Sequence, residues 1–230
     1  MKKHSVLKAA ALTAAAYTVS LRGRTKHPDL EILRRYRFAH RGYHDKPVVP
    51  ENSLPAFRRA IEHGWGAELD VHLMKDGTLA VIHDSSLLRT AGADVQIEDL
   101  TREELENYRL EGTDERIPLF DEVLALFENT TPLIIELKAA NGNHFALSKA
   151  VCERLDSYKG VFCIESFDPM VVADVRELRP GICRGQLAEN FLKDKGALDP
   201  VRSVLATGLI GNALAKPDFI AFKFEDRSCI

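Results

Sequence analysis

Short apolar segments alternate with helix-like segments along most of the chain, and this rhythm constrains the fold more than any other feature. The candidate strands are residues 36–42, 66–73, 79–84, 132–138, 161–167, 182–188 and 218–224. Several are dense in valine, isoleucine, leucine and phenylalanine, which is typical of parallel strands buried on both faces. The helix candidates between them are residues 53–64, 120–130, 144–158, 169–181 and 200–209. The alternation predicts an α/β protein with a parallel sheet.

The composition is that of an ordinary globular protein. Of the 230 residues, 45% are hydrophobic and 28% are charged, so the chain can bury a sizeable core. The formal net charge is −3, and no basic tract is interleaved with aromatic residues. Nucleic acid is therefore not an expected partner.

The first 27 residues differ in character from the rest and form a separate predicted segment. Two lysines precede an apolar stretch at residues 6–21, which Lys8 interrupts, and three basic residues follow it. The stretch is shorter than the ~20 residues of a perpendicular membrane span. A signal peptide, an uncleaved anchor and a helix lying on the membrane all fit the pattern. We expect association with a bacterial-type cell membrane, with the side left open because both flanks are basic.

Acidic residues recur where the candidate strands end, which is where a (β/α)₈ barrel builds its active site. Glu68 and Asp70 are two residues apart on one strand and therefore share a face. Glu136 lies on another strand. Two carboxylates from one strand and a third from another suit a hard divalent cation, Mg²⁺ or Ca²⁺.

Basic residues and histidines accompany these carboxylates. Arg41 and Lys138 supply positive charge suited to a phosphate group. His40 and His83 lie on separate candidate strands, so they can act as base and acid on either side of a reacting centre. This combination favours phosphodiester cleavage over glycoside hydrolysis, which uses two carboxylates and no paired histidines.

Residues 84–117 break the strand–helix rhythm. The segment is polar, with no strong strand, and Thr101 and Glu104 form a capping box for a short helix. We interpret it as a small insertion in a barrel domain that spans residues 28–230.

A set of short motifs resembles the glycerophosphodiester phosphodiesterase family. In order, they are HRG at 40–42, PEN at 50–52, ELD at 68–70, KDG at 75–77, HD at 83–84, ELK at 136–138 and ESFD at 165–168. The resemblance implies a TIM-type (β/α)₈ barrel with a small insertion after strand 3. It also implies hydrolysis of glycerophosphodiesters to glycerol 3-phosphate and an alcohol.

The resemblance assigns roles to particular side chains. It implies the acid–base pair His40 and His83, the metal ligands Glu68, Asp70 and Glu136, and the phosphate-binding residues Arg41 and Lys138. It places Glu51 and Asn52 at the edge of the site.

The roles of several other residues stay open. Glu165 is a catalytic, structural or second-ion residue, and Ser166 or Asp168 can simply cap the helix that Pro169 begins. His72 shares a strand face with Glu68 and would contact the residues of the site rather than the substrate.

The sequence offers no candidate for an eighth strand after residue 224, so the barrel is expected to be incomplete. Three functions remain open on this basis. The first is a metal-dependent glycerophosphodiester phosphodiesterase. The second is a phospholipase D-like or cyclising lyase acting on lysophospholipids. The third is an inactive barrel serving as a membrane-bound binding module.

Overall fold

The computed structural model describes residues 15, 17–19, 23, 26–193 and 199–229. Within them a seven-stranded sheet runs in the order β1-β2-β4-β5-β6-β7, with β3 paired to β2 beside this path. The strands are β1 Phe38–Ala39, β2 Gly66–Leu73, β3 Leu79–Val81, β4 Leu133–Leu137, β5 Phe162–Ser166, β6 Arg184–Ala188 and β7 Phe219–Phe222. The six strands of the main path are parallel. They form an incomplete (β/α) barrel, as the sequence predicts.

The third strand runs in the opposite direction from the one predicted. β3 is antiparallel to β2, with Val71 facing Val81 and Leu73 facing Leu79. The five-residue connection carries Asp76 and Gly77, and Gly77 has a φ of +86°, which favours glycine. Such a short connection closes a hairpin, whereas a parallel crossover needs a dozen residues or more. β3 thus begins beside the last residue of β2 and runs back, so that Val81 lies level with Val71 and with Leu137 at the end of β4.

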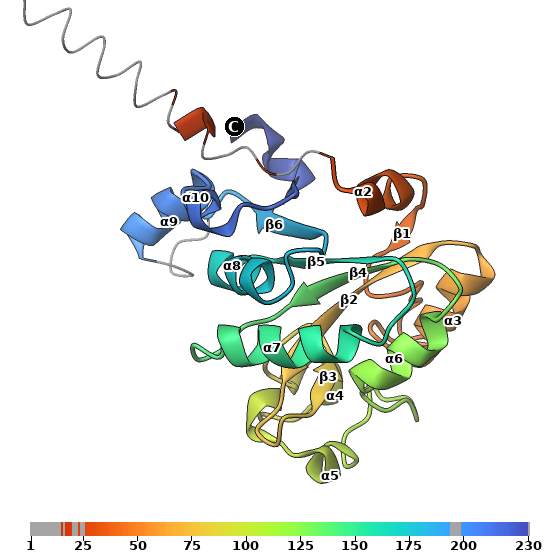
Figure 1. The fold of residues 1–230 in the computed structure, drawn as a ribbon. Coiled ribbons are helices and arrows are strands. Elements are labelled where there is room, and N and C mark those ends of the chain that lie inside the picture. Colours follow the sequence, from red (N-terminus) through yellow and green to blue (C-terminus); the bar gives the residue numbers. More distant parts are fainter. Residues whose placement is uncertain (1–14, 16, 20–22, 24–25, 194–198, 230) are drawn as a thin grey trace, which may run out of the picture.

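One face of the sheet packs against the helices that follow the strands (Figure 1). These are α3 Leu54–Glu62, α6 Phe120–Phe127, α7 His144–Leu155 and α8 Pro169–Leu178. The helices α9 Pro200–Thr207 and α10 Asn212–Ala215 lie between β6 and β7 in the chain, and α10 packs against α8. Every second residue of β2 and β4, such as Leu69 and Ile135, joins Phe57, Phe120 and Leu147 in the largest core cluster. Their burial leaves the alternate strand residues facing the barrel interior.

A second cluster fills the amino-terminal end of that interior. Cys163 and Cys183 are buried there as free thiols. Leu30 and Leu33 of α2 Pro28–Leu33 pack against them. This apolar layer closes the bottom of the half-barrel, so the polar interior residues lie toward the carboxyl end.

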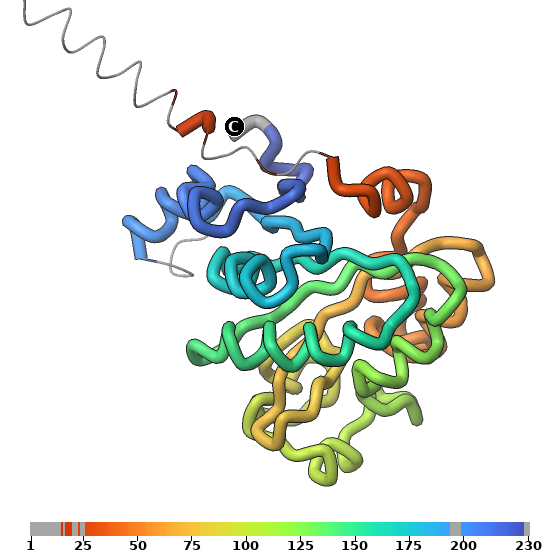
Figure 2. Tube along the Cα trace, in the orientation of Figure 1, coloured from red at the N-terminus to blue at the C-terminus, as the bar shows by residue number. Residues whose placement is uncertain are grey.

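The segment between β3 and α6 forms a lobe with its own apolar cluster (Figure 2). It contains α4 Leu88–Ala91, the 3₁₀ helix η1 Ile97–Asp99 and α5 Arg102–Leu105, where a single helix was expected. The capping box of Thr101 and Glu104 is present at α5. Ile82, Leu87 and Ile97 are among the lobe's buried residues, and Met74 of the β2–β3 connection packs with them.

The predicted membrane segment at residues 6–21 lies mostly outside the described residues. Where Tyr17 is described, its hydroxyl donates a hydrogen bond of 2.6 Å to the carbonyl of Gly208. Among the described helices, none has both the length and the apolar character needed to cross a bilayer. The chain's last described element is the 3₁₀ helix η2 Phe224–Cys229.

Candidate active site

The HRG motif forms a tight turn at the end of β1. Arg41 and Gly42 both have positive φ, at +58° and +78°. A Cβ on Gly42 would lie 2.8 Å from the Cβ of Ala56, so only glycine allows α3 to approach this closely. The turn points the backbone amide of Arg41 at Glu68 Oε2, 2.9 Å away.

The three predicted metal ligands meet on the interior face of the sheet. Asp70 on β2 and Glu136 on β4 are partners in the parallel register, and Glu68 lies two residues before Asp70. One ligand oxygen from each of the three carboxylates lies within 4.8 Å of the other two. All three side chains are buried. The sequence prediction of an acidic cluster is therefore confirmed.

Burial and mutual repulsion change the pKa values in this cluster. Burial, with the charges of Asp70 and Glu136, raises the pKa of Glu68 well above its usual value. Burial also raises the pKa of Glu136 to about 7 against the opposing charge of Lys138. Burial works against ionisation of Asp70 too, but Lys138, His83 and Asn52 outweigh it and lower its pKa. Without a cation, the cluster therefore retains protons near neutral pH, where ordinary carboxylates have already lost theirs.

The donor atoms of the cluster fit a hard divalent cation. Glu68 Oε1 is buried and has no hydrogen-bond partner among the described residues, and buried Asp70 Oδ1 faces the ammonium group of Lys138. An unpartnered buried carboxylate oxygen is costly, and a cation coordinated by oxygen would satisfy it. The oxygen-only donor set suits Mg²⁺ or Ca²⁺ rather than a thiophilic metal.

Two basic side chains border the cluster, as predicted. Lys138 Nζ lies 3.1 Å from Asp70 Oδ1 and 2.8 Å from Glu136 Oε1. Arg41 Nε lies 3.7 Å from Asp70 Oδ2. Both are largely buried and both reach the carboxylate cluster, so they are placed to contact an anionic group bound beside it.

The two histidines occupy different surroundings. The side chain of His40 is 70% exposed, and its Nε2 lies 3.9 Å from Glu68 Oε2. His83 is half-buried, and its Nδ1 lies 2.5 Å from Asp84 Oδ1. Desolvation lowers the pKa of both rings, helped at His40 by the charge of Arg41. Both rings are therefore mainly neutral at pH 7.

Glu51 and Asn52 lie at the edge of the site, and the structure adds the contacts that they make there. Buried Glu51 accepts hydrogen bonds from Arg41 at 2.9 Å and Arg89 at 2.6 Å, and Lys46 lies 2.5 Å away. These cations outweigh the effect of burial and hold the pKa of Glu51 far below its usual value. Asn52 Nδ2 donates to Asp70 Oδ2 at 2.8 Å.

His72 proves to be a supporting residue that the sequence only hinted at. Its Nε2 lies 3.2 Å from the carbonyl oxygen of His83, and its Nδ1 lies 2.7 Å from Glu98 Oε1. Ser85 donates to the same Glu98 oxygen at 3.0 Å. A carbonyl oxygen and a carboxylate oxygen both accept, so each of the two contacts is made by a ring N–H, and the one at Nε2 holds the His83 main chain. No sequence pattern predicted the contact with Glu98, because Glu98 lies in the inserted lobe.

Glu165 extends the acidic row to a third strand. It is the register partner of Glu136 on β5, and it is buried. Burial raises its pKa to about 8, with further increases from Glu136 and Asp70. Its neighbours have structural roles: Ser166 Oγ donates to the Leu137 carbonyl, and Asp168 caps α8 at the amide of Met170.

The fold and the site together define a class of protein. It is a (β/α) barrel whose carboxyl end carries a carboxylate site suited to a cation, with basic side chains and two histidines beside it. The chain belongs to the glycerophosphoryl diester phosphodiesterase family, whose model matches residues 40–212. That span contains every site residue described above.

Individual relatives agree with this membership. A glycerophosphodiester phosphodiesterase from Caldanaerobacter subterraneus is 37% identical over 161 residues, covering 65% of each chain. A human lysophospholipase D is 38% identical over 121 residues, or 47% of this chain and 37% of that protein. The chain thus spans less than two thirds of the length of these relatives.

Solved structures show the same fold. A glycerophosphodiester phosphodiesterase from Thermotoga maritima is 31% identical, with a TM-score of 0.57 over 84% of this chain and 76% of that one. A phosphodiesterase from Oleispira antarctica, solved with its product sn-glycerol-3-phosphate, has a TM-score of 0.63 at 23% identity. It covers 85% of this chain and 88% of that one.

Proposed function

We propose that this chain catalyses the metal-dependent hydrolysis of glycerophosphodiesters to glycerol 3-phosphate and an alcohol. The observation that carries the proposal is the convergence of Glu68, Asp70 and Glu136 within one ion's reach, inside the span that matches the family. The product bound to the Oleispira relative supports the choice of substrate.

The proposed cofactor is one divalent cation, Mg²⁺ or Ca²⁺, held by Glu68, Asp70 and Glu136. When bound, it would neutralise charge on the phosphate oxygens and so favour attack on phosphorus. The unpartnered buried oxygen of Glu68 supports this assignment.

In the proposed mechanism the chain's own residues bind the phosphate and move protons. Arg41 and Lys138 orient the phosphodiester above the carboxylates. One histidine of the pair His40 and His83 removes a proton from the attacking hydroxyl or water, and the other protonates the departing alcohol. The lowered pKa values of both rings favour the neutral form that the base requires near neutral pH, and the ring that acts as acid must be protonated when the substrate is bound.

Phosphorus NMR of the products tests the reaction. Incubation with glycerophosphocholine and either cation should convert the diester signal into that of glycerol 3-phosphate. Accumulation of a stable cyclic phosphate would contradict the hydrolase and favour a cyclising lyase. No turnover at any cation concentration would favour the inactive binding module.

A phospholipase D-like action on lysophospholipids is the second candidate. The similarity to a human lysophospholipase D over 121 residues favours it. This reaction would use the same site, but on a substrate whose glycerol carries an acyl chain. The same product analysis, carried out with a lysophospholipid, therefore distinguishes the two functions.

We also propose that residues 6–21 attach the protein to a membrane. The basic flanks and the apolar stretch support this, and attachment would raise the local concentration of lipid-derived substrates. Deletion of residues 1–26 should release the protein from membrane fractions and preserve activity on glycerophosphocholine. Unchanged membrane retention would contradict the attachment, and lost activity would show that the segment belongs to the fold.

A further inference from the structure

Arg89 belongs to the inserted lobe, yet its side chain reaches residues that surround the active site. It lies on α4, and the neighbouring Leu87 fixes this short helix by packing fully buried in the lobe's apolar cluster. Arg89 Nη2 donates to Glu51 Oε1 at 2.6 Å, and Arg89 Nε donates to Asp84 Oδ2 at 2.5 Å. One guanidinium group therefore joins the loop before α3 to the residue that follows His83.

Glu51 is the firmly held end of this connection. It is 4% exposed, its Oε1 also accepts a hydrogen bond from Arg41 at 2.9 Å, and Lys46 Nζ lies 2.5 Å from its Oε2. Buried charges keep their place when several partners satisfy them. Loss of Arg89 would leave Arg41 and Lys46 on this carboxylate, so the position of Glu51 does not depend on Arg89.

Asp84 is the end that depends on Arg89. Its side chain is 30% exposed, and among the described residues its carboxylate pairs only with Arg89 and with His83. Burial works against its ionisation, but the hydrogen bonds from Arg89 and His83 outweigh this effect and lower the pKa of Asp84. An ionised carboxylate can only accept, so His83 Nδ1 donates its proton to Asp84.

The contact with Asp84 determines which nitrogen of His83 is left for chemistry. With the proton of the neutral ring on Nδ1, Nε2 carries the lone pair that can take up a proton and later release it. His72 holds the main chain of His83, whereas Asp84 holds the ring. A half-exposed aspartate rotates easily about its side-chain bonds unless its second oxygen is also held, and Arg89 holds that oxygen.

We propose that Arg89 is a positioning residue that acts through Asp84 to keep His83 in the tautomer with a free Nε2. The inference rests on the proposed function, in which His83 transfers a proton. Glu51 anchors Arg89, Arg89 anchors Asp84, and Asp84 orients the ring. The inserted lobe thereby takes part in catalysis without contacting the reacting atoms.

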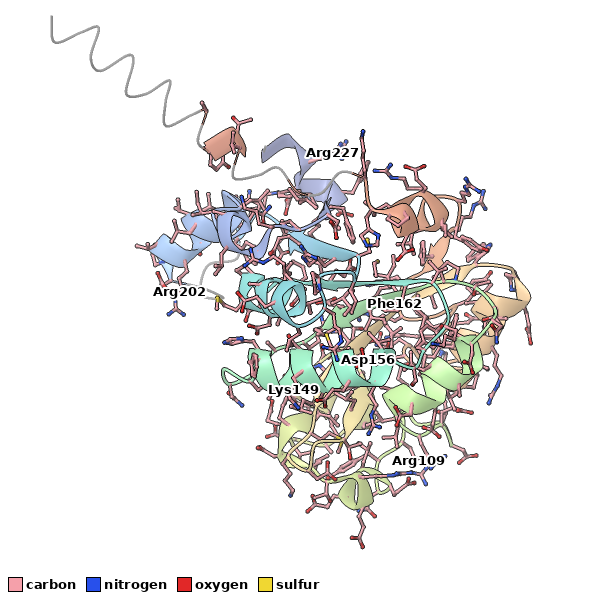
Figure 3. The ribbon with its side chains drawn as sticks, viewed as in Figure 1. Arg109, Lys149, Asp156, Phe162, Arg202 and Arg227 are labelled. Atoms are coloured by element: carbon pink, nitrogen blue, oxygen red, sulfur yellow. The ribbon has the colours of Figure 1, made fainter. Side chains whose placement is uncertain are left out.

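A matched pair of substitutions in the lobe tests this role. Arg89→Ala removes the connection, and the variant should fold because buried Glu51 keeps its other two cations. Arg109→Ala is the control, since Arg109 is an exposed arginine of the same lobe (Figure 3). Its Nη1 donates to the main-chain carbonyls of Glu106 and Tyr108, which lie within the lobe.

Side-chain ¹⁵N NMR of the chelator-treated full chain at pH 8 gives a readout that needs no turnover, and His83→Gln assigns the His83 signals. In the unmodified chain and in Arg109→Ala, we expect a proton on Nδ1 and none on Nε2. In Arg89→Ala the signals should shift to those of a mixture of the two tautomers, because Asp84 is no longer held. An unchanged His83 tautomer in Arg89→Ala, or a proton on Nε2 in the unmodified chain, would overturn the proposal.

Turnover of glycerophosphocholine supplies the second readout. Arg89→Ala should lower kcat by about 10- to 100-fold with little change in KM, because Arg41 keeps its contact with Glu51. Combining Arg89→Ala with Asp84→Asn should cost little more than Asp84→Asn alone, since both changes act on the same ring. Arg109→Ala should leave both constants unchanged.

The other results would separate Arg89 from the proposed reaction. A raised KM at unchanged kcat in Arg89→Ala would show that Arg89 binds the substrate itself, and multiplied losses in the double variant would show that it acts apart from Asp84. Either result would overturn the positioning role. The expected change of tautomer without turnover by the unmodified chain would instead refute the proposed hydrolase and leave the action of Arg89 on His83 established.

Discussion

His40 approaches Glu68, whereas His83 contacts Asp84, so the two rings reach the reacting centre from different supports. Because they transfer protons rather than hold the ion, we expect His40→Ala and His83→Ala each to lower turnover by roughly 10²–10⁴-fold. Cation affinity, measured by calorimetry, should remain close to that of the unmodified chain. Near-normal turnover of glycerophosphocholine by either variant would remove that histidine from the mechanism.

His72 is expected to act through His83. His72→Ala should lower kcat by about 10- to 100-fold with little change in KM, because loss of the bond to the His83 carbonyl leaves the ring misplaced. His72→Gln, whose amide can donate to that carbonyl, should restore most of kcat. His144→Ala is the matched control, since His144 pairs with Asp174 between α7 and α8. Failure of the glutamine to rescue kcat would show that His72 has only a packing role.

The raised pKa values of the acidic row predict an unusual pH dependence for the metal-free protein. Glu136 and Glu165 keep their protons to about pH 7 and 8 when folded, but release them near pH 4.5 when unfolded. The folded state therefore binds more protons in this window, and the free energy of unfolding falls as pH rises from about 5 to 8. Each retained proton contributes a slope of about 1.4 kcal/mol per pH unit.

Glu165→Gln should flatten that slope, because its amide does not titrate. Urea unfolding of the chelator-treated protein at pH 5, 6, 7 and 8 measures the effect. An unchanged slope in Glu165→Gln would show that Glu165 is ionised in the folded protein throughout this range.

Individual site residues were largely predictable because each lies in a short motif near a strand end. Glu68 and Asp70 could be assigned to one face from their spacing alone. The contacts of Glu51 with Arg89 and of His72 with Glu98 could not be predicted. Both partners come from the inserted lobe, whose placement depends on tertiary packing rather than on any local pattern.

At the scale of secondary-structure elements, the turn after β1 is the most sensitive point. Gly42→Ala must accommodate a φ of +78° and a contact 2.8 Å from Ala56 Cβ. We expect it to cost about 1–3 kcal/mol of stability and to displace α3 from the Arg41 turn. Gly64→Ala, also at positive φ but with nothing within 4 Å, controls for backbone strain alone. Equal destabilisation by the two variants would show that close packing at Gly42 is unimportant.

The helices and strands followed from the sequence more securely than their directions did. Apolar periodicity located α3 and α8, and the structure caps these helices with Ser53 and Asp168. The antiparallel course of β3 was missed because an apolar run alone carries no direction. Its short connection to β2 was the available signal, since five residues cannot form a parallel crossover.

Across the whole molecule, the parallel sheet divides its two faces between stability and chemistry. Apolar residues of alternate strand positions form the core with the helices, and the polar positions between them converge at the carboxyl end. An apolar pocket of about 790 Å³ is lined by residues that follow β5, by the end of β6 and by α9 and α10. No local pattern predicted it, because its walls come from segments that are separated along the chain.

The most direct test of the account is cation-dependent turnover by the full chain. Glycerol 3-phosphate released from glycerophosphocholine is measured after chelation and then with increasing Mg²⁺ or Ca²⁺, for the unmodified chain and for Glu136→Gln. We expect negligible release after chelation, saturable activation by at least one cation, and a loss of about 10²-fold or more in the variant. Undiminished release in chelator, or full activity of Glu136→Gln, would contradict a metal-dependent site built on Glu68, Asp70 and Glu136.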